Sequence, residues 1–329
     1  MNRREFMGYV LAAAAAQGIG SSGLRAAGGE LPRRTLGRTG ASVSIVGLGG
    51  FHIGKQQDPA ESVRIIRAAV DGGITFLDNS WDYNEGQSEL RMGEALRGGY
   101  RERVFLMTKF DGRDAASAAR QIDESLRRLR TDHVDLLQFH EIIRPTDPER
   151  IFARRGAIEA ALAARKAGKA RFLGFTGHKS PEIHLSMLRA CEAHGFRPDT
   201  VQMPLNVLDA SHDSFQAKVL PELVRRGIGV LGMKPFGDDF VLRSGAVSPE
   251  DGLRYAMSVP GVDVTITGID APAILDQALR LARGFEPLSA EARAALERKA
   301  AAVAADGQFE AYKSSHHFDS THEHPEWLG

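Results

Sequence analysis

The fold of this chain is indicated by one stretch of sequence, Gly73-Ile-Thr-Phe-Leu-Asp-Asn-Ser-Trp-Asp-Tyr-Asn-Glu-Gly-Gln-Ser-Glu-Leu-Arg-Met-Gly-Glu-Ala-Leu96. Residues 74–77 form a short run of β-branched and aromatic side chains, which is typical of a buried strand. Asp78 ends that strand, Tyr83 lies in the polar loop after it, and a helix begins near Ser88. Such residues face the C-terminal mouth of a parallel sheet, where α/β barrels place their chemistry. On this stretch alone, a strand cap and a surface tyrosine remain an equal alternative.

Strands and helices alternate along the rest of the chain. After a hairpin near Arg33–Ser44, the predicted pairs are 44–48 with 59–71, 74–77 with 88–97, 104–108 with 115–130, 134–139 with 156–167, 170–175 with 181–194, 200–203 with 214–226, 228–232 with 249–259, and 264–267 with 272–282. Eight such units predict an α/β fold of the (β/α)8 TIM-barrel type over residues 33–287. A doubly wound sheet is the alternative, but Gly47-Leu-Gly-Gly-Phe-His-Ile-Gly lacks its Gly-x-Gly-x-x-Gly signature.

Composition limits the partners that this chain can have. The 329 residues contain 42 Lys plus Arg and 42 Asp plus Glu, with no basic patch, so we expect no nucleic-acid partner. The single cysteine, Cys191, lies in an apolar helical pattern. It has no disulfide partner within the chain, and we interpret it as a small core residue.

The first 27 residues have the pattern of an export signal. Arg3 and Arg4 precede Phe6, an alanine-rich apolar run and a stretch of small residues, and this order resembles a twin-arginine signal. The apolar run is too short to span a membrane. We therefore expect a periplasmic or otherwise exported protein that uses the twin-arginine machinery. If this interpretation is wrong, the segment is an amphipathic or unstructured N-terminus of a cytoplasmic protein.

Residues 288–329 are predicted to add an alanine-rich helix, 290–305, and an aromatic tail, 307–329, that packs on the barrel. The tail contains four histidines, His316, His317, His322 and His324. They lack the cysteine partners and fixed spacing of a zinc site, so we expect no metal there.

Four residues at the ends of strands form a set with an evident chemical use. Lys109 is expected to end the third strand and His140 the fourth, beside Asp78 and Tyr83. A nearby ammonium favours the phenolate of a tyrosine and is expected to bring its proton-donating range toward neutrality. Asp78 would orient Lys109, and His140 could donate a hydrogen bond to a carbonyl oxygen that becomes negative during reduction.

The sequence around these residues resembles that of the aldo-keto reductase family. The matching pieces are Arg34-Thr-Leu-Gly-Arg-Thr-Gly40, Gly73–Ser80 with Tyr83, Thr108-Lys109, Ser125–His140 and Gly168–Phe175. The resemblance implies a (β/α)8 barrel that binds an extended nicotinamide dinucleotide at its C-terminal face. It implies Tyr83 as proton donor, Lys109 and Asp78 as its tuning residues, His140 as the contact to the substrate oxygen, and direct hydride transfer to a carbonyl carbon.

The dinucleotide site implied by the resemblance departs from the family pattern in several places. Thr176-Gly177-His178 replaces the usual Ser-Asn, Met233 replaces the stacking tyrosine, and Asp270 stands where NADP-preferring members often carry a basic residue. The residues expected to bind the cofactor, NADP(H) or NAD(H), are Gly50, Phe51, Asp78, Thr176, His178, Gln202, Met233, Lys234, Pro235, Phe236, Gly237, Thr267, Gly268, Ile269, Asp270 and Gln277.

The expected activity is hydride transfer between the dinucleotide and a small-molecule aldehyde, ketone, sugar or alcohol. The substrate-binding residues are expected to be His52, Trp81, Phe110, His140 and Glu141, although these loop residues could instead pack against the tail. The alternative is a non-catalytic, sensing barrel that resembles channel-associated members of the family. Because an exported enzyme has no free dinucleotide around it, the sequence also suggests a cofactor retained under the tail and recycled in place; ordinary cofactor exchange remains open.

Overall fold

The computed structural model describes residues 30–304 and 306–329, and the predicted export signal lies outside this range. From Leu31 to Gly329 the chain forms one compact unit. Within the described residues, no helix combines the length and apolar character that a membrane span requires.

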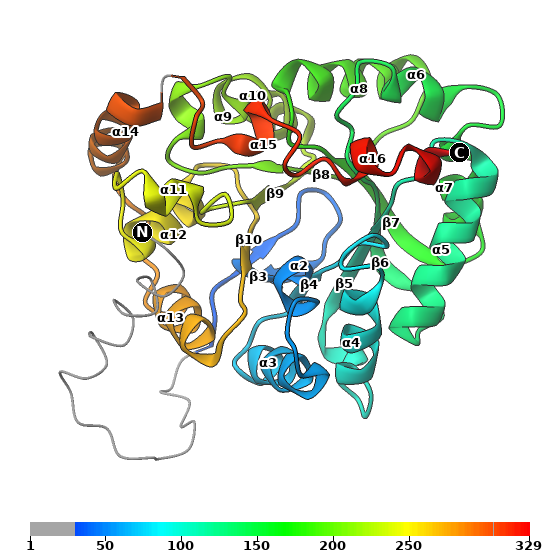
Figure 1. Ribbon diagram of the computed structural model, residues 1–329, viewed down its shortest axis with the longest axis horizontal. Helices are drawn as coiled ribbons and strands as arrows, with labels where there is room; N and C mark the ends of the chain where they lie inside the picture. The colour runs from blue at the N-terminus through cyan, green and yellow to red at the C-terminus, as the bar shows by residue number, and fades with distance from the viewer. Residues whose placement is uncertain (1–29, 305) are drawn as a thin grey trace. The chain divides into compact units, whose positions relative to one another are not determined.

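Eight parallel strands close into a barrel in the order β10-β3-β4-β5-β6-β7-β8-β9 (Figure 1). The strands are β3 (Val46–Gly49), β4 (Phe76–Asp78), β5 (Phe105–Phe110), β6 (Val134–Phe139), β7 (Ala170–Thr176), β8 (Thr200–Pro204), β9 (Gly229–Met233) and β10 (Val264–Gly268). The closed ring confirms the predicted (β/α)8 barrel and excludes the doubly wound sheet. Nearly every strand residue is buried because the strands contact the interior on one side and helices on the other.

The helices surround the barrel in the order that the sequence predicts (Figure 1). The main ones are α3 (Pro59–Asp71), α4 (Gln87–Ala95), α5 (Ala115–Leu129), α7 (Ala157–Lys166), α8 (Pro181–Ala193), α12 (Pro249–Ser258), α13 (Pro272–Arg283) and α14 (Ala290–Ala304). Shorter ones are α2 (Gly50–Ile53), α6 (Asp147–Phe152) and α11 (Phe240–Arg243). Cys191 is buried in α8, as expected for a core residue.

One predicted helix, 214–226, is divided in the structure. It forms α9 (Phe215–Lys218) and α10 (Leu220–Arg226), which meet at Val219. Pro221 explains the break, because proline has no amide hydrogen and its ring clashes with the carbonyl four residues earlier. The prediction of one continuous helix was therefore wrong.

The predicted hairpin packs against the barrel interior. Strands β1 (Arg33–Thr35) and β2 (Ser42–Ser44) pair antiparallel. Leu36 and Val43 of this hairpin belong to one buried cluster with interior side chains such as Phe76, Phe105 and Met107. The rings of Phe76 and Phe105 stack with their centroids 5.3 Å apart. This apolar filling makes the barrel a packed scaffold, so that the open strand ends can hold polar chemistry.

The C-terminal tail, residues 307–329, crosses the face of the barrel as the red segment in Figure 1. It contains α15 (Ala311–Ser314), α16 (Ser320–Glu323) and the 3-10 turn Pro325–Leu328. At its far end, the backbone N–H of Arg113 donates to Leu328 O at 2.8 Å. The side-chain amide of Gln121 donates to Trp327 O at 2.9 Å. These contacts attach the tail to α5 and the loop before it.

Candidate active site

The candidate catalytic residues come from three neighbouring strands. Asp78 is the last residue of β4, Lys109 lies near the end of β5, and His140 directly follows β6. The loop that carries Tyr83 is held to β5, because the backbone N–H of Trp81 donates to Lys109 O at 3.0 Å. The parallel strands β4, β5 and β6 end at the same mouth, so the four side chains meet there.

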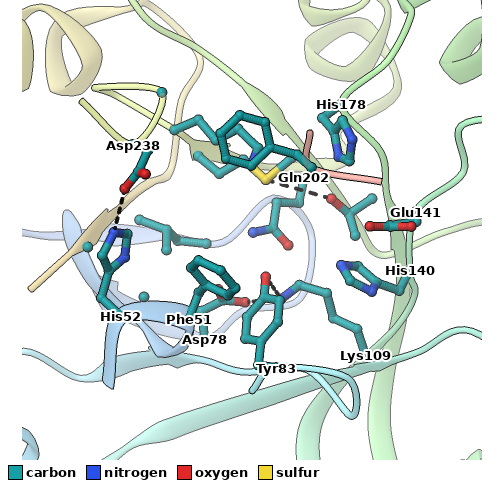
Figure 2. A pocket seen from close by; sticks show the side chains of 18 of the residues that line it. Phe51, His52, Asp78, Tyr83, Lys109, His140, Glu141, His178, Gln202 and Asp238 are labelled. Carbon is teal, nitrogen blue, oxygen red and sulfur yellow. Dashed lines mark hydrogen bonds and ion pairs between the residues drawn. The ribbon is translucent and has the colours of Figure 1, made fainter. Parts of the chain in front are cut away.

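Lys109 is the centre of this group (Figure 2). Its ammonium nitrogen lies 2.7 Å from an Asp78 carboxylate oxygen as an ion pair. The same nitrogen donates to Asn79 O at 2.7 Å and to the Tyr83 hydroxyl oxygen at 3.0 Å. The ammonium is therefore held by two hydrogen bonds and one ion pair. Lys109 is 1% exposed, so water does not compete for these contacts.

The structure corrects the expected tuning of Tyr83. Burial, followed by the charges of Asp78, Asp82, Glu141 and Asp111, raises the pKa of Tyr83 well above its ordinary value. The ammonium of Lys109 does not offset this effect, because Asp78 already balances its charge. Tyr83 therefore stays protonated at neutral pH, which suits a proton donor in reduction.

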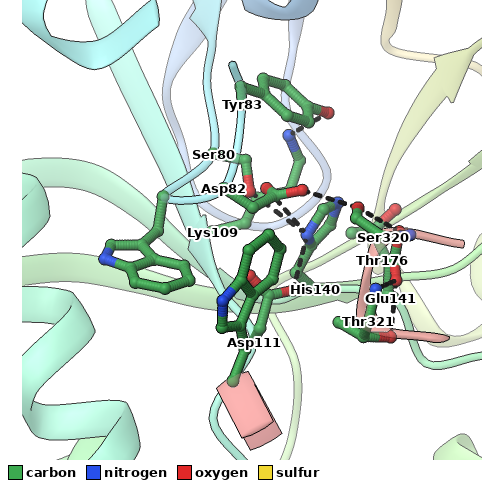
Figure 3. Close-up of polar contacts among 12 residues, drawn as sticks. Ser80, Asp82, Tyr83, Lys109, Asp111, His140, Glu141, Thr176, Ser320 and Thr321 are labelled. Atoms are coloured by element: carbon green, nitrogen blue, oxygen red, sulfur yellow. Dashed lines mark hydrogen bonds and ion pairs between the residues drawn. The ribbon is translucent and has the colours of Figure 1, made fainter. Parts of the chain in front are cut away.

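His140 is held by acids that the sequence analysis did not assign. Its Nδ1 lies 2.9 Å from Asp111 Oδ1, 3.3 Å from Asp82 Oδ1 and 3.2 Å from Ser80 Oγ (Figure 3). Burial alone would lower the pKa of His140, but the carboxylates of Asp82, Asp111 and Glu141 outweigh it, and the pKa is raised. The ring also lies edge-on to Tyr83, with the two centroids 5.8 Å apart.

A cavity of about 330 Å³ opens above this group. Its lining contains most of the residues predicted for cofactor and substrate, namely Phe51, His52, Asp78, Tyr83, Lys109, His140, Glu141, Thr176, His178, Gln202, Met233, Lys234, Pro235, Phe236, Gly237, Thr267 and Gly268.

Three residues predicted at the pocket lie elsewhere. Gly50 packs against the backbone of Asp78, and a Cβ atom added at Gly50 would come within 2.4 Å of Asp78 O. Phe110 is buried against Phe139, with ring centroids 5.0 Å apart. Trp81 contacts the tail residue Trp327 edge-on at 5.3 Å. Trp81 thus follows the tail-packing alternative, and none of the three lines the cavity.

The residues predicted for the adenosine end of the dinucleotide also lie outside the cavity. Ile269 is fully buried, Asp270 is half-buried after β10, and Gln277 is half-buried on α13. The cavity ends at Gly268 on this side. The roles assigned to these three residues therefore stay predictions.

Glu141 faces the cavity, but its carboxylate is used to hold the tail. One oxygen accepts from the backbone N–H and the hydroxyl of Ser320, both at 2.9 Å. The other accepts from the backbone N–H of Thr321 at 2.8 Å and from its hydroxyl at 2.6 Å. These four donors satisfy both oxygens, so the expected role of Glu141 as a direct substrate contact is replaced by anchoring of α16.

The tail itself contributes part of the cavity wall. His317, Phe318, Ser320 and Glu323 line it. Phe318 lies under Lys234, whose ammonium is 4.2 Å from the ring centroid. The sequence analysis expected the tail over the cofactor groove but assigned no individual tail residue to the site.

Further lining residues were missed on the barrel, namely Gly49, Asp82, Gly177, Asp238 and Ile266. Asp82 and Asp111 had a usable signal, because one is adjacent to Tyr83 and the other follows Lys109 by two residues. Asp238 had none. Its carboxylate pairs with His52 Nε2 at 3.1 Å, and this hydrogen bond lowers the pKa of Asp238 to about 2.

The loop after β9 has an unusual backbone at the cavity. Lys234 and Asp238 both have positive φ, 54° and 67°, a conformation that costs a residue other than glycine about 1 to 3 kcal/mol. Lys234 is half-buried, and the desolvation of its ammonium lowers the pKa of Lys234 to about 8. Within the described residues this nitrogen contacts aromatic rings and has no ion pair. A partly desolvated cation of this kind can receive an anionic ligand.

The closed parallel barrel places this group at its C-terminal mouth, where α/β-barrel enzymes carry their active sites. The model of the aldo/keto reductase family matches residues 45–251, and the chain belongs to that family. L-galactose dehydrogenase from Arabidopsis thaliana is 31% identical over 66% of this chain and 69% of its own length.

Solved structures show the same fold. An aldo-keto reductase from Bacillus halodurans in its holo form has a TM-score of 0.69 at 22% identity, covering 82% of this chain and 96% of the other. An aldo-keto reductase from Klebsiella pneumoniae in complex with NADPH has a TM-score of 0.67 at 24% identity, covering 82% and 95%.

Proposed function

We propose that this protein transfers a hydride between a nicotinamide dinucleotide and a carbonyl or alcohol substrate, with Tyr83 as the proton donor. The observation that carries the proposal is the placement of the Lys109 ammonium between Asp78 and the Tyr83 hydroxyl at the base of the cavity. Lys109 orients the hydroxyl, and Asp78 balances its charge. A sensing barrel would not need this arrangement, so the enzyme is the favoured interpretation.

The residues around the cavity fit a nicotinamide dinucleotide, which supplies the hydride when bound. The side-chain oxygen of Gln202 is buried and has no hydrogen-bond partner among the residues that the structure describes, so it can accept from a carboxamide. Met233 provides an apolar surface beside Thr176, from which its sulfur accepts a hydrogen bond at 3.9 Å. Lys234 provides the cation for a phosphate group.

The cavity suits a polar carbonyl substrate. Its lining mixes Phe51 and Phe318 with His52 and several carboxylates, so it can bind a sugar or polyol as well as an aromatic ketone. The similarity to L-galactose dehydrogenase supports including sugars. The experiment is a panel of aldehydes, ketones and sugars, assayed for consumption of dinucleotide. Absence of turnover with every class would contradict the proposal.

Cofactor choice is expected to depend on Asp270. A carboxylate beside the adenosine ribose repels a 2′-phosphate and accepts a hydrogen bond from a 2′-hydroxyl, which favours NAD(H). Arg280 and Arg283 on α13 could compensate, so NADP(H) remains open. We expect Asp270→Arg to shift the ratio of the two dissociation constants toward NADP(H) by about tenfold. A ratio that does not move would remove Asp270 from ribose recognition. Asp276→Arg, at an exposed position on α13, is the matched control.

We further propose that the protein is exported with its dinucleotide already bound. Support comes from the twin-arginine pattern of the first residues and from the tail contacts at the cavity. Glu141 holds the tail at Ser320 and Thr321. The tail residue Asp319 is held in addition by His178 at 2.9 Å and by Lys179 at 2.8 Å. A tail fixed at several points would slow cofactor release, and the enzyme would recycle its cofactor by alternating oxidation and reduction. Normal exchange is the alternative.

Cutting the chain at Asp306 is expected to abolish this retention. Full-length protein, dialysed and then denatured, should release about one dinucleotide per chain, whereas the truncated protein should release almost none. Because truncation exposes buried partners of the tail, Thr321→Val provides a milder test by removing one hydrogen bond to Glu141. Gln308→Ala, at an exposed tail position, is the control. Rapid loss of dinucleotide from the full-length protein would contradict retention.

A further inference from the structure

The hydrogen bonds of His140 determine which of its ring nitrogens can act on a substrate. Nδ1 faces two carboxylates and one hydroxyl, so it carries a proton. Within the described part of the chain, Nε2 has no hydrogen-bond partner, and His140 lines the cavity. Nε2 is therefore the atom available to a bound carbonyl or alcohol oxygen.

This arrangement has a consequence for the charge of the ring. If only Nδ1 is protonated, Nε2 is an acceptor and cannot donate to a carbonyl oxygen. Only the imidazolium, with both nitrogens protonated, donates to the oxygen as it becomes negative. The neutral ring can instead accept a hydrogen bond from an alcohol.

Asp111 is placed to keep the ring charged. Its carboxylate is fully buried, and within residues 30–304 and 306–329 its only side-chain hydrogen bond is the one to His140. Its backbone N–H is held separately, by the side chain of Gln121 at 2.8 Å. Burial and the charge of Asp82 raise the pKa of Asp111 to about 6, despite the opposing effect of His140. A carboxylate with this single partner has no structural task apart from the imidazole.

Asp82 completes the arrangement from the other side. Its Oδ1 faces His140 Nδ1, and its Oδ2 lies 2.8 Å from the hydroxyl of Ser320, which it shares with Glu141. The titratable and polar groups around His140 are Ser80, Asp82 and Tyr83 from the loop after β4, Lys109 and Asp111 from the end of β5, Glu141 after β6, and Ser320 from the tail. In this group the carboxylates of Asp82, Asp111 and Glu141 outnumber the single ammonium of Lys109. The resulting net negative charge favours a protonated ring.

We propose that Asp111, which accepts the hydrogen bond of Nδ1–H, and Asp82, whose carboxylate lies 3.3 Å from Nδ1, are positioning residues that hold the ring of His140 as an imidazolium, so that Nε2–H stabilises the substrate oxygen in reduction. This inference rests on the proposed function. In that reaction the hydride and its electron pair reduce the carbonyl carbon, Tyr83 gives the proton to the oxygen, and the dinucleotide is oxidised. His140 donates a hydrogen bond and transfers no proton.

The pH dependence follows from the sign of the charge effect. The imidazolium is present below the raised pKa of His140 and is lost as the pH rises through it. Reduction should therefore decline on the alkaline side, whereas oxidation of an alcohol should increase there. Removing the charge of Asp111 lowers the pKa of His140. The decline of reduction and the increase of oxidation should then both occur at lower pH.

Asp111→Asn tests this because it removes the charge and keeps the shape and an acceptor oxygen. We expect kcat/KM for reduction to fall about tenfold at pH 8 and to recover at pH 6, with the alkaline limb moved down by about one pH unit. Asp82→Asn should move the limb in the same direction. Asp123→Asn, which removes an exposed carboxylate from α5, is the control and should leave the profile unchanged. A uniform loss at all pH values, with an unmoved limb, would show a merely structural role and overturn the proposal.

A second measurement does not require turnover. The ring nitrogens of His140 can be titrated by NMR, with the resonance assigned by its loss in His140→Gln. The wild type should titrate above the ordinary histidine value, and Asp111→Asn should titrate about one unit lower. An unchanged titration overturns the role of Asp111 even if the protein is a reductase. A shifted titration in a protein that reduces no carbonyl substrate would instead show that the proposed function fails while the charge control stands.

Discussion

Lys109→Met is expected to lower turnover by at least about two orders of magnitude. Among the described residues, the ammonium of Lys109 is the only side-chain group that donates a hydrogen bond to the Tyr83 hydroxyl. It also neutralises Asp78. Methionine fills a similar volume without a charge or a donor. The hydroxyl then loses its orientation beside an uncompensated carboxylate, and the pH profile should shift. Dinucleotide affinity should change little.

Two controls separate this effect from unfolding. Breaking a buried ion pair destabilises a protein by about 3 to 5 kcal/mol, so the thermal unfolding of Lys109→Met must be measured beside its kinetics. Lys109→Met combined with Asp78→Asn removes the unpaired carboxylate and should recover stability without recovering turnover. Lys169→Met, at an exposed lysine paired with Asp123, should behave as wild type. Wild-type turnover in Lys109→Met would contradict the mechanism.

Tyr83→Phe is expected to remove most turnover, by about two orders of magnitude or more, while dinucleotide binding persists. The substitution deletes only the hydroxyl. The edge contacts of the ring with Phe51 and His140, at 5.5 Å and 5.8 Å, remain. Loss of turnover with retained binding separates a redox enzyme from a barrel that only senses the dinucleotide.

The matched control for Tyr83→Phe is Tyr100→Phe, which removes a hydroxyl that donates to Asp71 at the surface. That variant should keep full turnover. If Tyr83→Phe also keeps it, the proton comes from another group, and the assignment of Tyr83 as the donor is wrong.

The fold could be predicted because its signals are local. Buried strands alternate with amphipathic helices, and several of these helices have their own start signal, such as Asp58, whose side chain accepts from Ala60 N before α3. The strand ends in the structure differ from the predicted ends by one or two residues, because the pairing of neighbouring strands decides where a strand stops. Predicted 74–77, for example, became Phe76–Asp78, which pairs with β3 and β5.

The strand-end residues of the site could also be predicted, because parallel strands bring their ends to one mouth. The individual contacts of the tail could not be predicted in the same way. Glu141 and Ser320 are 179 residues apart, and no periodicity links two such positions. Trp81 and Phe110 were assigned to the pocket, but Trp81 in the loop after β4 contacts Trp327, and Phe110 at the end of β5 contacts Phe139.

The charges around His140 were missed for a different reason. Asp82 and Asp111 lie next to residues of the predicted set, but an isolated acid in a loop is most often solvent-exposed. Only the closed barrel and the tail show that Asp111 is fully buried and faces the imidazole. The raised pKa of Tyr83 was missed for the same reason. The sequence analysis considered the ammonium of Lys109, but neither the burial of Tyr83 nor these carboxylates.

The central claim is direct hydride transfer at the Tyr83 site, and isotope transfer tests it most directly. Dinucleotide carrying deuterium at the transferred position of its reduced ring is incubated with the protein and a carbonyl substrate in ordinary water, and the alcohol is examined by mass spectrometry and NMR. The account predicts one deuterium on the carbinol carbon for each dinucleotide oxidised, with Tyr83→Phe slowing its appearance. Alcohol without deuterium, or dinucleotide left reduced after prolonged incubation with every substrate class, would contradict it.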